Sequence, residues 1–70
     1  MAERALGIRA AYLLEWARKQ DAVAGSIAEA AQHLVERGDE LAAQAAVQKC
    51  HSLRVKALLA RAQAKALPHV

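Results

Sequence analysis

The histidines, the cysteine and the acidic residues are the side chains of this chain that could carry catalysis or bind a metal. Successive histidines, His33, His51 and His69, are eighteen positions apart, so no pair has the i, i+4 spacing of helical zinc ligands. Cys50 and His51 are sequence neighbours, and neighbours on a helix point about 100° apart, which is poor geometry for a nucleophile and its base. We therefore expect no enzymatic activity, and no metal, cofactor or small-molecule substrate.

Positive charge is concentrated in the second half of the chain. The ten Lys and Arg residues outnumber the seven Asp and Glu residues, and every acidic residue lies within residues 1–40. On a helix, Arg54, Arg61 and Lys65 fall within one narrow arc, here called the basic arc, which could neutralise the phosphates of a nucleic acid or meet an acidic partner. The arc has no interleaved aromatic side chains for base stacking, and helix dipoles also favour cations near a C-terminus.

The only aromatic residues are Tyr12 and Trp16, one helical turn apart. Large aromatic side chains usually complete a small core, but tyrosine and tryptophan are also enriched at binding hot spots. Val47 and Leu58 point away from the other large apolar residues of the last predicted helix. These four residues are the predicted anchors of a protein interface.

Alanine dominates the apolar composition and limits the core that the chain can build. Hydrophobic residues make up 56% of the 70 residues, but nineteen of these hydrophobic residues are alanine and none is phenylalanine. A chain this short gains no more than about 3–5 kcal/mol from a single core without staples. The lone cysteine excludes an internal disulfide. Three glycines and one proline are too few for a sheet of tight hairpins. We expect an Ala-rich, all-α fold that is completed by oligomerisation, as a dimer or with a larger protein.

Charged or amide side chains interrupt every apolar stretch, so none approaches the ~18 residues that span a bilayer. The first residues contain no apolar block followed by a small-residue cleavage site. A single free thiol fits a reducing compartment. We therefore expect a cytoplasmic protein that does not bind membranes.

The periodic apolar pattern predicts one helical domain over residues 1–70, with two breaks. Gly25 can end a helix, and Ser26 with Glu29 forms a capping-box pattern for the next one. Gly38 and Asp39 offer a second helix end and N-cap. The predicted fold is an antiparallel helical hairpin or three-helix bundle, with helices at about 2–23, 27–37 and 39–67.

A second interpretation joins the last two helices. From Ile27, the alternation of four and three residues continues through Gly38 to positions 41, 45, 48, 52, 55, 59, 62 and 66. One helix over 27–67 would satisfy this pattern, because an isolated glycine costs only about 1 kcal/mol. We favour the break at Gly38, because a hairpin buries more of the aliphatic residues than a rod does.

Part of the chain, Ile27–Cys50, resembles one tetratricopeptide repeat. The resemblance rests on small and aliphatic residues on both sides of a Gly-Asp turn: Ala30, Ala31, Leu34, Gly38, Asp39, Ala43, Val47 and Cys50. The large aromatic residues of that repeat are missing, and the chain contains one copy, whereas stable arrays need about three. The resemblance implies a closely packed helical hairpin with a protein-binding habit.

Together these patterns predict a non-enzymatic interaction module, a small helical adaptor, chaperone or inhibitor that binds a larger protein. The alternative is a small basic dimeric regulator that contacts nucleic acid through the basic arc.

Overall fold

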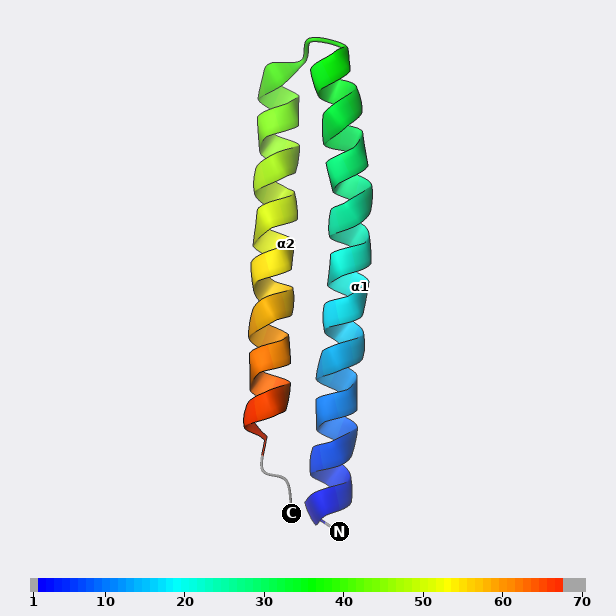
Figure 1. The fold of residues 1–70 in the computed structure, drawn as a ribbon, viewed down its shortest axis with the longest axis vertical. Helices are drawn as coiled ribbons and strands as arrows, with labels where there is room; N and C mark the ends of the chain where they lie inside the picture. Colours follow the sequence, from blue (N-terminus) through cyan, green and yellow to red (C-terminus); the bar gives the residue numbers. More distant parts are fainter. Residues whose placement is uncertain (1, 68–70) are drawn as a thin grey trace.

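The chain folds into two long helices that lie side by side and antiparallel (Figure 1). The computed structural model describes the backbone of residues 2–67 and the side chains of residues 7–67. Helix α1 spans Ala2–Glu36 and helix α2 spans Glu40–Ala66, and the hairpin is 55 Å long. The all-α class and the helical hairpin are confirmed. The described residues form two helices, so the three-helix bundle is not what this chain adopts.

The predicted break at Gly25 and Ser26 is wrong, because α1 runs through both residues without interruption. Ser26 caps no helix. Its hydroxyl donates to the carbonyl of Ala22, 3.4 Å away and one turn back, as mid-helix serines often do. The packing against α2 continues on both sides of Gly25, with Ala24 and Ala31 buried. That packing offsets the ~1 kcal/mol that a mid-helix glycine costs.

The break at Gly38 is confirmed, which excludes one helix over 27–67. Gly38 has a φ of 81°, the left-handed conformation that glycine adopts without a Cβ penalty. The amides of Gly38 and Asp39 donate to the carbonyls of Val35 and Leu34, both at 2.9 Å, which is the Schellman pattern of a helix C-terminus. The Asp39 side chain then accepts from the amide of Ala42 at 3.2 Å and caps α2.

Leu67, at the other end of α2, has an extended backbone with a ψ of 138°. This conformation is the one that a residue before a proline prefers. The sequence predicted that the last helix ends at about residue 67, and the proline that follows, Pro68, lies outside the described residues. The sequence therefore placed the end of α2 within one residue.

Small side chains fill the contact between the helices. Within residues 7–67, all the buried hydrophobic residues are alanine or cysteine, and they recur mainly every seven residues. This alanine seam consists of Ala17, Ala24, Ala31, Ala43, Cys50, Ala57, Ala60 and Ala64. Half-buried residues such as Leu13 and Leu53 alternate with them. A repeat of seven with small residues at one core position lets two helices pack side by side at close range.

The alanine seam leaves most large apolar side chains outside it. Among the side chains of residues 7–67, ten large apolar ones are exposed, from Val55 at 39% to Leu41 at 83%. Within residues 2–67, neither helix offers a segment that is both long and apolar enough to cross a bilayer. The exposed apolar side chains are thus available on the surface of the hairpin for contacts with other molecules.

Candidate functional site

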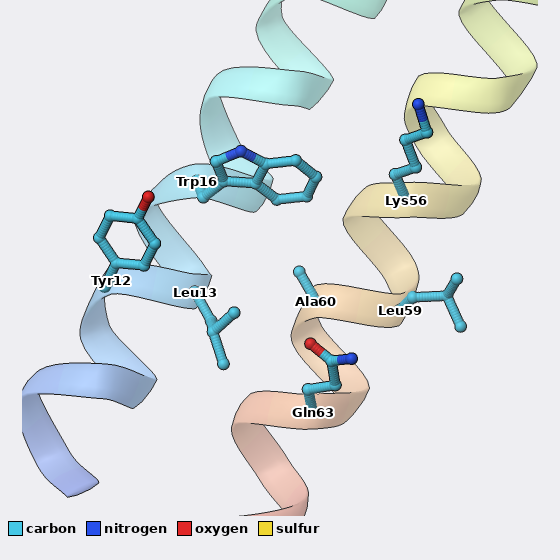
Figure 2. Close-up of a pocket in the computed structure, with 7 residues that line it drawn as sticks. All are labelled: Tyr12, Leu13, Trp16, Lys56, Leu59, Ala60 and Gln63. Carbon is cyan, nitrogen blue, oxygen red and sulfur yellow. The ribbon is translucent and has the colours of Figure 1, made fainter.

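Tyr12 and Trp16 lie at an open groove between the two helices (Figure 2). We call it the aromatic groove; it is about 320 Å³ in volume and is lined by Tyr12, Leu13 and Trp16 from α1 and by Lys56, Leu59, Ala60 and Gln63 from α2. The indole of Trp16 extends from α1 toward α2, whereas the Leu59 side chain is directed away from α1 (Figure 2). Leu13, Trp16 and Ala60 make the floor of the groove apolar, whereas Lys56 and Gln63 place polar groups along its α2 rim.

The floor of the groove is formed by part of the alanine seam. Ala17, Ala57 and Ala60 form a buried cluster, and Leu13 and Trp16 pack against that cluster from the groove side. Alanine at these positions leaves room for the large indole, which is half-buried. Tyr12, one turn earlier, is 68% exposed. Trp16 is therefore held in place by packing, and Tyr12 is free to meet a partner.

The face that contains the groove carries cations and no carboxylate. Sixteen helix positions flank the alanine seam on the side of the groove, and each recurs after seven residues. They are 9, 12, 16, 19, 23, 26, 30 and 33 on α1, and 42, 45, 49, 52, 56, 59, 63 and 66 on α2. Arg9, Lys19, Lys49 and Lys56 stand at four of these positions, all exposed, and none of the sixteen is Asp or Glu. We call this surface the aromatic face. It is the one place where the aromatic residues and basic residues of α2 come together.

The basic arc lies along the other edge of the α1–α2 contact. There, Arg61 donates a hydrogen bond to the carboxylate of Asp21 on α1, and both side chains are half-buried. Arg54 and Lys65 are exposed. One of the three cations that the sequence offered to a nucleic acid is therefore engaged within the hairpin.

Val47 and Leu58 share that edge with the basic arc. The helical positions 47, 54, 58, 61 and 65 all fall within one arc of α2. Val47 and Leu58 are both exposed, and Val47 borders a hollow that is also lined by Ala28, Cys50 and Arg54. The four predicted anchors are therefore divided: the aromatic pair lies on one edge of the hairpin, and Val47 and Leu58 lie on the other.

Sequence reasoning missed the α2 rim of the groove. Lys56, Leu59 and Gln63 were not singled out, because their position depends on which side of α2 meets α1. The signal was present in the small residues Ala57, Ala60 and Ala64, which recur at three and four residues immediately beside them. With that repeat taken as the contact with α1, the rim residues fall next to Trp16.

The remaining reactive groups do not form a site. Among residues 2–67, no three His, Cys, Asp or Glu side chains are grouped so that they could hold a metal ion. Cys50 is a free thiol buried in the alanine seam, whereas its neighbour His51 is exposed. Comparison of the chain with models of known families, with curated proteins and with solved structures gives no match.

Proposed function

We propose that the chain is a non-enzymatic interaction module whose aromatic groove binds an acidic amphipathic helix of a larger protein, in the manner of a small adaptor, chaperone or inhibitor. One observation carries this proposal: the exposed Tyr12 and the half-buried Trp16 lie on a face that has four cations and no carboxylate at its sixteen positions. A partner for that face needs apolar side chains for the groove and acidic side chains for its flanks.

A two-helix hairpin leaves much of its apolar surface uncovered. Two helices bury only one side of each other, and a third helix packed along the groove would form a three-helix bundle with them. Trp16 is already fixed against Ala17, Ala57 and Ala60, so little conformational entropy would be lost when a partner packs on it. A fixed tryptophan beside an exposed tyrosine is typical of a binding hot spot.

The cations of the aromatic face determine which kind of helix would bind. Lys56 lines the groove, and Arg9, Lys19 and Lys49 are exposed along the same face. Acidic residues on the flanks of a bound helix would face these cations, which would raise the association rate and disfavour basic partners. The proposed partner is therefore an amphipathic segment with a negative net charge.

A nucleic acid is the second candidate, and the geometry favours it less. Trp16 is half-buried against the seam, so it offers bases a smaller ring surface than an exposed aromatic side chain would. In the basic arc, Arg61 is paired with Asp21. The cations that are still able to contact phosphates are divided between the two edges of the hairpin.

Fluorescence anisotropy with three labelled probes tests the proposal. The probes are a helical peptide with apolar residues at i, i+3, i+4 and i+7 and acidic flanks, the same peptide with lysine for each acid, and a short DNA duplex. We expect the acidic peptide to bind best and its affinity to fall as salt rises. Tyr12→Ala and Trp16→Ala should each weaken it about tenfold or more, which corresponds to about 1.4 kcal/mol.

Leu58→Ala is the matched control, because Leu58 is about as exposed as Tyr12 but lies on the opposite edge. Its binding should equal that of the wild type. Equal binding of the acidic and basic peptides, or an equal loss in Leu58→Ala and Tyr12→Ala, would contradict the proposal. Binding of the duplex alone would establish the nucleic-acid alternative.

A further inference from the structure

The side of α2 that faces away from α1 carries a second apolar repeat. Its eight positions alternate by four and three residues, and every one is exposed. We call this surface the outer stripe; it consists of Leu41, Ala45, Gln48, Ser52, Val55, Leu59, Ala62 and Ala66. None of the eight is charged, although 24% of the chain is charged. A heptad repeat without charges is the pattern of a helix-packing surface.

The outward side of α1 does not share this pattern. Its central positions 8, 15, 22, 29 and 36 include Glu15, Glu29 and Glu36, all exposed. Helix α1 therefore presents an ordinary solvated face, with Glu15 in an ion pair to Arg18 at 2.5 Å. The absence of charge is specific to α2 and needs its own explanation.

We propose that a second copy of this chain covers the outer stripe, with the two α2 helices packed antiparallel about a two-fold axis. The stripe complements itself in this arrangement. With the axis between Ser52 and Val55, each Val55 lies opposite the second copy's Ser52, and Ala45 lies opposite Ala62. The same register places Leu41 opposite Ala66 and Leu59 opposite Gln48, so each large aliphatic side chain meets a smaller or an unbranched one.

The size of the contact matches what a dimer of this kind needs. Helix α2 has 27 residues and is therefore about 40 Å long. A side-by-side contact along that length buries on the order of 600 Å² per copy, at the lower end of specific interfaces. A hairpin whose buried core is alanine and cysteine gains much from such added burial.

The dimer and the aromatic groove share Leu59, and the outer stripe also contains three further positions of the aromatic face, Ala45, Ser52 and Ala66, which do not line the groove. The two kinds of binding are told apart by their opposite responses to salt. In the dimer, the two copies of Lys56 flank the axis and repel each other, so salt strengthens self-association by screening that repulsion. Binding of an acidic helix weakens under the same change. The failure of one proposal is thus distinguishable from the failure of the other.

Light scattering after size-exclusion chromatography tests the dimer. The wild type should have twice the 7.5 kDa of one chain. Val55→Glu brings two carboxylates together near the axis and should reduce the mass to that of one chain, with the helical circular dichroism retained. Ala22→Glu, an equivalent change on the outward side of α1, should leave the dimer intact. A monomeric wild type at high micromolar concentration, or a Val55→Glu dimer, would overturn the proposal.

Cross-linking tests the register independently of mass. In a Cys50→Ala background, which places alanine at one more seam position, Lys56→Cys should give a covalent dimer with a short bismaleimide. Lys19→Cys, exposed on α1, should give none. Equal cross-linking of the two variants would rule out the α2–α2 arrangement.

Discussion

At the scale of single residues, Asp21 and Arg61 connect the two helices directly. Theirs is the one ion pair between α1 and α2 among the side chains of residues 7–67. The other carboxylate–arginine pair, Glu15 with Arg18, lies within one turn of α1, and its hydrogen bonds lower the pKa of Glu15. Both residues of that local pair are exposed, so it stabilises the hairpin little.

Asp21→Asn is therefore expected to lower the free energy of unfolding by about 0.5–1 kcal/mol. Arg61 would then be left half-buried without its carboxylate partner. Urea unfolding followed by circular dichroism measures the effect. Glu15→Gln is the control and should change the midpoint less. A larger loss in Glu15→Gln than in Asp21→Asn would show that the inter-helix pair does not hold the hairpin together.

At the scale of the elements, the two glycines with predicted breaks behave differently. Gly38 has a positive φ and turns the chain, whereas Gly25 lies within a continuous helix where an added Cβ meets nothing within 4 Å. The sequence alone offered the same local signal at both, a glycine followed by an N-cap residue. The two glycines differ in the packing around them. The contact with α2 continues past Gly25, from Ala24 of the alanine seam through the half-buried Ile27 to Ala31.

Gly25→Ala should accordingly raise the free energy of unfolding by about 0.5–1 kcal/mol, the difference in helix propensity. Gly38→Ala should lower it by about 1–2 kcal/mol, the cost of a left-handed conformation with a Cβ. Thermal unfolding of both variants shows whether each substitution raises or lowers the stability of the hairpin. A lower melting temperature for Gly25→Ala would mean that α1 is broken at that glycine after all.

Most of the fold, and about half of the candidate site, could be read from the sequence. Periodicity predicted helical segments, the Gly38-Asp39 capping signal predicted the turn, and Tyr12 and Trp16 were predicted as interface anchors, although their residue types alone did not decide between the core and the surface. The pairing of the helices was harder to predict, because α2 carries two heptad repeats and its large residues Leu41, Val55 and Leu59 lie in the repeat that does not face α1. Reasoning from large aliphatic residues selects the outer stripe, and the alanine seam is the actual contact.

At the scale of the whole molecule, the close approach of two alanine-lined helices decides which surfaces remain free. Ala57 is fully buried at the centre of the cluster beneath Trp16. A larger side chain there would separate the helices or displace the indole. Stability and the shape of the aromatic groove therefore depend on the same small residues.

Ala57→Leu should lower the free energy of unfolding by about 1–3 kcal/mol through overpacking. Ala22→Leu on the exposed side of α1 is the matched control and should change it little. Urea unfolding at equal protein concentration provides the comparison. If Ala57→Leu were as stable as the wild type, the seam would not be the closely packed contact described above.

The proposed binding surface can be located in one measurement, a ¹⁵N-correlated NMR titration of the chain with the acidic amphipathic peptide. The account predicts that shifts concentrate on the indole NH of Trp16 and on the amides of Tyr12, Lys19, Lys56 and Gln63. Amides around Val47, Leu58 and Ala22 should stay in place. Shifts centred on the Val47 and Leu58 edge, or no shifts at saturating peptide, would contradict binding through the aromatic groove.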